Sequence, residues 1–253
     1  MSSQSHTTIP PFFVNSIPKS GTHLMKPLLQ GVPALTHHAF IFPGHPNQVT
    51  DHMNKLSSMK TNEFANGHIF YNPEYKTLFQ LLKLKQVFQY RDPRDIVVSY
   101  AYFFMKFPDH PYRRYFMERG MDVKARCLEI INGIDHYPVR RPDIGTWYRK
   151  FTGWFNEENV LPVRYEDLVG SPESQTEVLK RILSFTGIEQ DPGKQDDLVR
   201  MMKRNVNPEK SPTYRKGQSG NWRQEFDEEV KERFKAVAGD LLIELGYEKD
   251  LNW

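Results

Sequence analysis

The chain has 253 residues, of which 38% are hydrophobic and 26% charged, and its 17 Phe, 12 Tyr and 4 Trp supply bulky side chains for a core. This composition excludes a short peptide and an intrinsically disordered chain. The formal net charge of +3 is too small for a surface that binds polyanions by its overall charge, so we expect any anion-binding site to be a local cluster.

The cysteine content and the apolar runs bear on where the chain resides. A single cysteine, Cys127, excludes an internal disulfide bond and favours a reducing compartment. The longest apolar run, residues 96–105, is broken by Ser99 and is well below the roughly 18 apolar residues that a membrane span needs. Residues 1–10 are polar and do not resemble a secretion signal. We therefore expect a cytoplasmic protein that has neither a membrane nor a nucleic acid as its partner.

Strand patterns and helix patterns alternate along the chain. In chain order the sequence predicts a strand at 12–16, a helix at 23–30, loops with one short helix at 48–60 across residues 31–70, a helix at 74–83, a strand at 86–90, a helix from 93, a strand at 160–165, a helix from 171 to 187 and a helix from 230 to 245. Pro27 falls inside the second of these elements, where it removes a backbone hydrogen bond. The alternation predicts a single α/β domain with a central, mainly parallel sheet flanked by helices and ligands at the carboxyl ends of its strands.

Two segments between these elements are less regular. Residues 105–145 mix basic, aromatic and turn-forming residues, which is typical of a variable lid. Aromatic residues then recur at helical spacing from Trp147 to Phe155. Such a stripe can stack a ligand, but far more often it packs into the core, and we predict the core role.

The segment from Ile17 to Thr22 has what a phosphate-binding loop requires. It joins a predicted strand to a predicted helix, Gly21 permits close approach of the backbone, and amides at the helix start point toward an anion. Lys19 adds a positive charge. Because this lysine precedes the glycine, the segment is not the Gly-x4-Gly-Lys-Ser/Thr nucleotide loop, which disfavours an ordinary ATPase. The same composition is also common in plain surface turns.

A second candidate follows the strand at 86–90. Arg91 leaves that strand and Ser99 lies about two helical turns further on, so a guanidinium and a hydroxyl could hold one phosphate from two sides. The alternative is that Arg91 and Arg94 merely pair with Asp92 and Asp95 on the surface, which is commoner for an isolated Arg–Asp cluster.

A third candidate lies near the C-terminus. Arg215 and Lys216 stand beside Gly217 and Gly220, and Trp222 follows. Two cations beside two glycines can form a basic loop that closes over an anion, or an ordinary exposed loop.

These candidates, with residues 163–168, occur in the order of a known family. The chain resembles the cytosolic-type sulfotransferases, whose donor is 3′-phosphoadenosine 5′-phosphosulfate (PAPS), through residues 17–22, 91–100, 163–168 and 215–222. The resemblance implies a P-loop-like sulfotransferase fold. It also implies an enzyme that moves a sulfuryl group from PAPS to a hydroxyl or amine of a small-molecule metabolite by in-line displacement, releasing 3′-phosphoadenosine 5′-phosphate (PAP) without a metal ion.

The resemblance assigns roles to individual residues. The family's catalytic histidine lies a little over twenty residues before the phosphate-binding arginine, and His68 lies 23 residues before Arg91. His68 is therefore expected to be the general base, Lys19 to stabilise the leaving group, and Ser99 to hold Lys19 until the acceptor binds. The implied donor-binding set is Lys19, Ser20, Gly21, Thr22 and His23 at the 5′-phosphosulfate, Arg91, Ser99, Arg215, Lys216 and Gly217 at the 3′-phosphate, and Tyr165 at the adenine.

The chain also departs from the family pattern. Leu24 stands where the family often has a tryptophan that stacks on adenine, and Asn66 stands where it has a lysine two residues before the catalytic histidine. Residues 31–64 and 102–145 are expected to form acceptor-side loops or a lid. Aromatic residues in the second of these suggest a partly aromatic pocket wall: Phe103, Phe104, Phe107, Tyr112 and Tyr115.

Other functions are compatible with parts of this pattern. An ATP-dependent small-molecule kinase could use the same anion loop, and the chain could be a non-catalytic module that binds an adenine nucleotide or RNA. His38, His45 and His52 recur every seven residues beside His37. They lack the closer spacing and supporting carboxylates of a metal site, so none is predicted.

Overall fold

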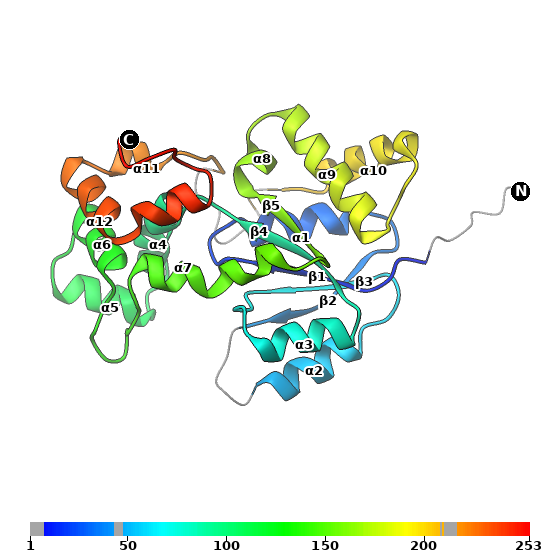
Figure 1. Ribbon diagram of the computed structural model, residues 1–253, viewed down its shortest axis with the longest axis horizontal. Helices are drawn as coiled ribbons and strands as arrows, with labels where there is room; N and C mark the ends of the chain where they lie inside the picture. Colours follow the sequence, from blue (N-terminus) through cyan, green and yellow to red (C-terminus); the bar gives the residue numbers. More distant parts are fainter. Residues whose placement is uncertain (1–7, 43–47, 208, 210–216) are drawn as a thin grey trace, which may run out of the picture. The chain divides into compact units, whose positions relative to one another are not determined.

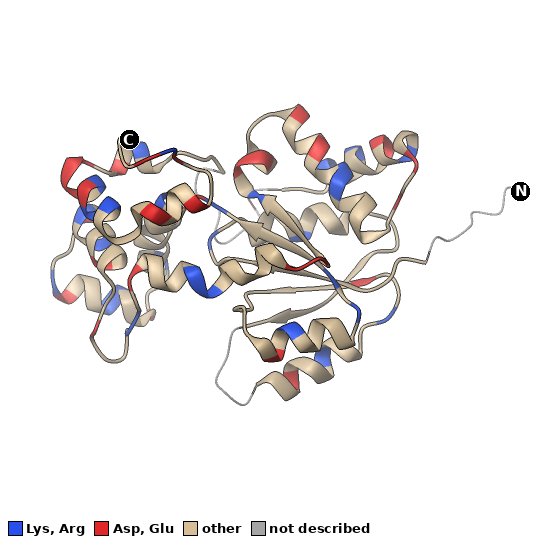
Figure 2. Cartoon of the chain, in the orientation of Figure 1, with Lys and Arg blue, Asp and Glu red and all other residues tan. Residues whose placement is uncertain are grey.

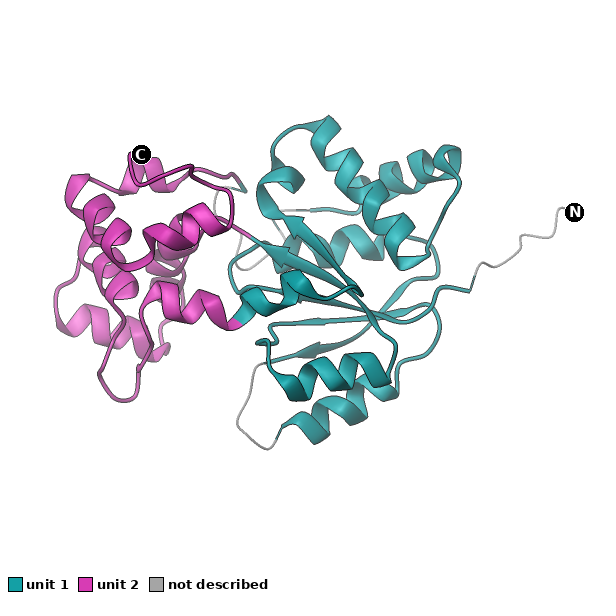
Figure 3. Cartoon of the chain, viewed as in Figure 1, with its two compact units in different colours: residues 1–90, 151–217 teal, residues 91–150, 218–253 magenta. Residues whose placement is uncertain are grey.

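The computed structural model describes residues 8–42, 48–207, 209 and 217–253. By its internal packing the chain divides into two compact units, drawn in different colours in Figure 3. Unit 1 consists of residues 1–90 and 151–217, and unit 2 of residues 91–150 and 218–253. Basic and acidic residues are interspersed along the helices of each unit (Figure 2), in keeping with the small net charge.

Unit 1 is built on a parallel sheet of five strands in the order β2-β3-β1-β4-β5. The strands are β1 (Phe12–Ser16), β2 (Thr36–Ile41), β3 (Glu63–Gly67), β4 (Lys85–Tyr90) and β5 (Val160–Arg164). The central strand β1 lies between β3 and β4, with Asn15 level with Gly67 and Ser16 level with Gln89. This arrangement confirms the predicted α/β fold with a parallel sheet. The short helix predicted at 48–60 is present as α2 (Val49–Ser57), whereas the prediction of loops for the rest of residues 31–70 is wrong, because β2 and β3 lie there.

Helices cover both faces of this sheet (Figure 1). They are α1 (Thr22–Gln30), α2 (Val49–Ser57), α3 (Pro73–Leu81), the 3-10 helix η1 (Gly153–Asn156), α8 (Tyr165–Val169), α9 (Pro172–Thr186) and α10 (Pro192–Arg204). On one face Phe13 of β1 packs on Phe79 of α3, with ring centroids 5.2 Å apart. The other face, toward α1 and α9, carries the main core of the unit.

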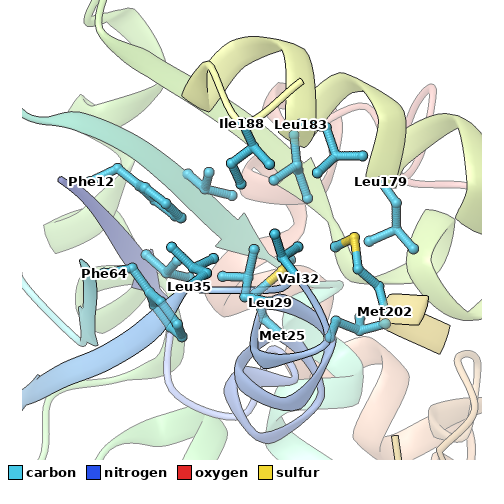
Figure 4. Packing of buried hydrophobic residues seen from close by; sticks show 14 of the residues in the cluster. Phe12, Met25, Leu29, Val32, Leu35, Phe64, Leu179, Leu183, Ile188 and Met202 are labelled. Carbon is cyan, nitrogen blue, oxygen red and sulfur yellow. The ribbon is translucent and has the colours of Figure 1, made fainter. Parts of the chain in front are cut away.

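The main core is formed by alternate residues of the inner strands and by the apolar sides of α1, α9 and α10 (Figure 4). Phe12 and Val14 of β1 point into it and are almost completely buried. Helix α1 continues through Pro27, and its Met25, Leu28 and Leu29 are fully buried. Burial of three large apolar side chains, each worth about 1.5–3 kcal/mol, offsets the backbone hydrogen bond that proline removes.

Unit 2 is helical. It contains α4 (Pro93–Lys106), α5 (Pro111–Glu118), α6 (Val123–Asn132), α11 (Trp222–Glu225), α12 (Glu228–Glu244) and most of α7 (Ile144–Thr152). The expectation of a loop or lid over residues 102–145 is therefore wrong in its secondary structure, because α5, α6 and the end of α4 lie there. Side-chain caps fix the starts of α4 and α6: Asp92 accepts from the Arg94 amide at 2.8 Å and Asp122 from the Ala125 amide at 2.8 Å.

The aromatic stripe of α7 and η1 packs into the interior. Trp147, Tyr148, Phe151 and Trp154 are buried, which confirms the predicted core role, while Phe155 is only partly buried. The Trp154 indole donates to the Ile69 carbonyl at 2.9 Å, so the one polar atom of its ring is satisfied. Within the described ranges, no helix is long and apolar enough to cross a lipid bilayer.

Candidate active site

The loop between β1 and α1 has the backbone conformation of an anion site. The Ser20 amide donates to the Ile17 carbonyl at 3.0 Å, which turns the chain tightly after the strand. Lys19 has φ +76° and Gly21 φ +92°, and a non-glycine residue in this left-handed region is uncommon and often marks a functional site. Gly21 is the N-cap of α1 and offers no side chain to the first-turn amides, and the first turn contains no acidic residue. These amides are therefore suited to an external anion.

Gly21 is required by its neighbours as well as by its φ angle. A Cβ atom placed on Gly21 would lie 2.5 Å from Cδ2 of Tyr165 and 3.0 Å from Nε2 of Gln89. The structure thus brings Tyr165, predicted at the adenine, against the loop predicted at the 5′-phosphosulfate. The sequence did not point to Gln89, a buried polar residue in the last part of β4.

His68 follows β3 and is held by β1. Its Nδ1 lies 2.7 Å from the Ser16 carbonyl oxygen and 3.1 Å from Ser16 Oγ. A carbonyl oxygen can only accept, so in the neutral ring Nδ1 carries the proton and Nε2 carries the lone pair. Ser16 Oγ is in turn 2.6 Å from Thr22 Oγ1. Hydrogen bonds therefore connect the imidazole to the first residue of α1.

The surroundings of His68 keep it neutral. Burial lowers the pKa of His68 from 6.5 to about 4; the hydrogen bond to the Ser16 carbonyl acts in the opposite direction, and the nearby His23 and Lys19 lower the pKa further. The pKa of His23 is also lowered, first by burial and then by Lys19 and Lys26. A neutral imidazole with its lone pair on Nε2 can accept a proton at neutral pH.

Two asparagines organise the strand ends: Asn15, which the sequence did not single out, and Asn66. Asn15 Nδ2 donates to the Ile69 carbonyl at 3.0 Å, and the Ile69 amide donates to Asn15 Oδ1 at 2.8 Å. This pair of bonds fixes the chain immediately after His68. Asn66, which replaces the family's lysine, accepts at Oδ1 from His37 Nε2 at 2.7 Å. The available signal for Asn15 was a polar residue within an otherwise apolar strand.

Unit 2 carries the second candidate, at the start of α4. Arg91 pairs with Asp95 at 3.1 Å, and Arg94 pairs with Asp92 at 2.7 Å and with Glu248 at 2.5 Å. Both predicted Arg–Asp pairs are therefore present. The expectation that these pairs lie on the surface is wrong, because all four residues are buried. Ser99 lies further along α4 and is partly exposed.

The third candidate is described only in part. Arg215 and Lys216 lie outside the described residues, and Gly217 has φ +62°. Trp222 is buried and its ring lies 3.9 Å from the Arg94 guanidinium carbon, so it belongs to the packing of unit 2.

The predicted site residues are thus divided between the two units. Lys19, Ser20, Gly21, Thr22, His23, His68, Tyr165 and Gly217 belong to unit 1, and Arg91 and Ser99 to unit 2.

The histidines at seven-residue intervals have separate partners. His38 Nδ1 lies 3.0 Å from Glu63 Oε2, and His52 Nδ1 lies 2.5 Å from the Tyr75 hydroxyl. His45 lies outside the described residues. Across the part of the chain that the structure describes, no group of three or more His, Cys, Asp or Glu side chains is arranged to hold a metal ion.

Comparison with known proteins gives a consistent result. A family model described as "Sulfotransferase domain" matches residues 10–246. The chain is 26% identical over 170 residues to mouse "Sulfotransferase 1 family member D1", an alignment that covers 60% of this chain and 52% of that protein. It is 27% identical over 173 residues to rat "Sulfotransferase 1E1", with the same two coverages. The chain spans about half the length of the curated relatives it matches.

A solved structure has the same fold. The crystal structure of mouse sulfotransferase SULT7A1 complexed with PAP superposes with a TM-score of 0.68, covering 92% of this chain and 84% of that chain. The two sequences are 18% identical, so this likeness supports the fold alone.

Proposed function

Because the chain belongs to the sulfotransferase family, we propose that it transfers a sulfuryl group from PAPS to a hydroxyl or amine of a small molecule. One observation carries the proposal. In unit 1 the loop proposed to bind the anion and the imidazole of His68 are linked through Ser16, whose Oγ lies 2.6 Å from Thr22 Oγ1 and whose carbonyl oxygen lies 2.7 Å from His68 Nδ1. An anion at the start of α1 would therefore lie near a base whose lone pair is on Nε2.

The described groups suit the two anionic ends of the donor. The first-turn amides of α1 and the charge of Lys19 suit a 5′-phosphosulfate, and the Tyr165 ring against Gly21 suits an adenine. For the 3′-phosphate the proposed contacts are Arg91 and Ser99 of unit 2, with Arg215, Lys216 and Gly217. His23, the second residue of α1, is proposed to contribute its amide to the first of these sites.

In the proposed reaction the acceptor oxygen forms a bond to sulfur while the bond from sulfur to the 5′-phosphate oxygen breaks, and PAP leaves with the bonding electron pair. His68 Nε2 removes the proton of the acceptor hydroxyl. Lys19 interacts with the negative charge that grows on the departing oxygen, an interaction that strengthens toward the transition state. Ser99 is proposed to hold Lys19 away from that oxygen until the acceptor binds.

The test is transfer of label from ³⁵S-PAPS to a panel of hydroxyl- and amine-bearing small molecules. We expect labelled product without Mg²⁺, and a loss of about 10²- to 10⁴-fold in rate for His68→Ala with PAP binding retained. His38→Ala is the matched control, since His38 lies on β2 and pairs with Glu63. PAP binding without transfer to any acceptor would instead indicate a non-catalytic nucleotide-binding module. Mg²⁺-dependent phosphoryl transfer from ATP would indicate a kinase.

A further inference from the structure

The first turn of α4 contains a carboxylate that holds three groups at once. Asp95 is almost completely buried, at 1% exposure. Its Oδ2 accepts from Arg91 Nη2 at 3.1 Å and from the Gly220 amide at 2.7 Å, and its Oδ1 accepts from the Trp222 amide at 3.0 Å. Both oxygens therefore face donors, and all four residues belong to unit 2.

The same arginine also contacts the second segment directly. Arg91 Nη2 donates to the Gln218 carbonyl at 3.0 Å, and that carbonyl also accepts from Asn221 Nδ2 at 2.7 Å. Residues 218–222 are thus fastened to the start of α4 by one carboxylate and one guanidinium. In the chain, Gln218 directly follows Gly217, so residues 218–222 are the C-terminal part of the predicted basic loop.

This geometry fixes the direction of the arginine as well as neutralising its charge. A guanidinium is planar, so two acceptors on one of its terminal nitrogens restrict the rotation of the whole group. The Tyr148 hydroxyl also donates to the Arg91 carbonyl at 3.0 Å, which holds the backbone at the same residue. A side chain that is already oriented loses less conformational entropy when it binds an anion.

The ion pair between Asp92 and Arg94, on the same helical turn, has different surroundings. Arg94 donates to Asp92 and Glu248, and its guanidinium carbon lies 3.9 Å from the ring centroid of Trp222 and 4.5 Å from that of Trp253. Of these partners, Asp92 and Trp222 are buried, and Glu248 and Trp253 are partly exposed. The Asp92–Arg94 pair meets residues 218–222 at the Trp222 ring, and it is a control for a buried ion pair that does not include the proposed phosphate-binding arginine.

We propose that Asp95 is a positioning residue for the 3′-phosphate of the donor, because it holds Arg91 and residues 218–222 together in the orientation that this phosphate requires. The inference rests on the proposed function, in which Arg91 binds the 3′-phosphate. It extends that function to a residue that does not touch the nucleotide.

The test compares two nucleotides that differ at the 3′ position. Isothermal titration calorimetry on the full chain measures Kd for PAP and for adenosine 5′-monophosphate, which lacks the 3′-phosphate. In Asp95→Asn the shape is kept but one acceptor becomes a donor that faces another donor. We expect Kd for PAP to rise about tenfold or more and Kd for adenosine 5′-monophosphate to change less than about twofold.

A double-mutant cycle completes the test. The loss of PAP affinity in the variant that combines Asp95→Asn with Arg91→Ala should be smaller than the sum of the two single losses, because Asp95 acts in part through Arg91. Asp92→Asn should lower the unfolding temperature while leaving the ratio of the two Kd values as in the wild type. An unchanged ratio in Asp95→Asn, an equal weakening of both nucleotides, or additive losses in the cycle would each overturn the inference.

Two further outcomes of the calorimetry have a defined meaning. If Asp95→Asn does not fold, Arg91→Lys replaces it, since an ammonium keeps the charge but lacks the planar fork; the Kd ratio should fall toward that of Arg91→Ala, and a wild-type ratio would overturn the inference. If the wild-type protein itself binds both nucleotides equally, the proposed function fails. That result is distinct from a wild-type preference that survives in Asp95→Asn.

Discussion

The position of His68 makes a quantitative prediction for the pH dependence of the proposed reaction. A general base acts in its neutral form, so activity is lost as the pH falls through the pKa of the base in the folded protein. Burial lowers the pKa of His68 to about 4. We therefore expect kcat/KM to stay nearly constant from pH 7.5 down to about 5.5, well below the range where an unperturbed histidine would be protonated.

The size of the effect follows from the two pKa values. With a pKa of about 4, roughly 97% of His68 is neutral at pH 5.5 and nearly all of it at pH 7.5, so the predicted change in kcat/KM is a few per cent. With the ordinary value of 6.5, only about 9% would be neutral at pH 5.5, and kcat/KM would fall about tenfold. The two cases are separable in an ordinary steady-state assay.

A variant at Phe40 tests whether burial causes the lowered pKa of His68. The ring of Phe40 lies edge-on to His68 with centroids 5.3 Å apart, so Phe40→Ala exposes one side of the imidazole to water. The acid limb of kcat/KM should then move upward, toward pH 6.5. A tenfold loss between pH 7.5 and 5.5 in the wild type, or a limb that does not move in Phe40→Ala, would refute the argument from burial.

The same pKa shift affects stability, with a definite sign. The folded pKa of His68 lies below its unfolded value, so the unfolded state binds the extra proton, and the stabilising contribution present above pH 6.5 is lost as the pH falls toward 4. Between pH 7.5 and 5.5 this group alone accounts for about 1.3 kcal/mol. Urea unfolding at both pH values is therefore a required control for the kinetic assay, and His68→Asn should lack this component.

Three stability predictions use other positions. Gly21→Ala places a Cβ 2.5 Å from the Tyr165 ring at φ +92°, and should lower the free energy of unfolding by about 1–3 kcal/mol in urea titrations; unchanged stability would contradict the tight approach. Ser171→Ala removes the Oγ that accepts from the Ser174 amide at the start of α9. The free energy of unfolding should fall by about 1 kcal/mol, and an unchanged value would mean that the cap does not stabilise the helix. Gln86→Met should raise the free energy of unfolding by about 1–2 kcal/mol, because neither amide atom of Gln86 has a partner among the described residues; a loss would mean that the amide is satisfied in solution.

The strands that the sequence predicted and those it missed differ in a physical way. β1 and β5 are mainly apolar, and β1 and β4 each lead directly into a recognisable signal, the loop at residues 17–22 and the helix cap Asp92. β2 and β3 carry polar residues on the same sheet, and His37 of β2 donates to Asn66 of β3. Each polar group satisfies the other, so both are accommodated without an apolar pattern. A pairing between residues 29 apart cannot be seen in a local window.

In the candidate active site, too, contacts between residues far apart in the chain were not visible in the sequence. Residue types predicted the loop at Lys19, and the family resemblance assigned the base to His68 and the adenine contact to Tyr165. The contacts that connect the loop to the base were not predicted, because Ser16 reaches His68 only through the register of β1 against β3, in which Asn15 is level with Gly67. A shift of one residue would turn the Ser16 side chain to the other face of the sheet.

The start of α4 shows why an ion pair does not by itself decide between a structural and a binding role. From the sequence, a phosphate contact by Arg91 and a pair between Arg91 and Asp95 were alternatives. A guanidinium has five N–H donors, so a pair made through Nη2 does not prevent the same group from binding an anion. What separates the two arginines is the rest of their surroundings. Arg94 packs against the Trp222 ring and pairs with Asp92, whereas the carboxylate that holds Arg91 also holds Gly220 and Trp222 of the predicted basic loop. A buried carboxylate shared between an arginine and a loop is therefore a sign of orientation, and the ratio of two nucleotide affinities measures it more directly than any melting temperature.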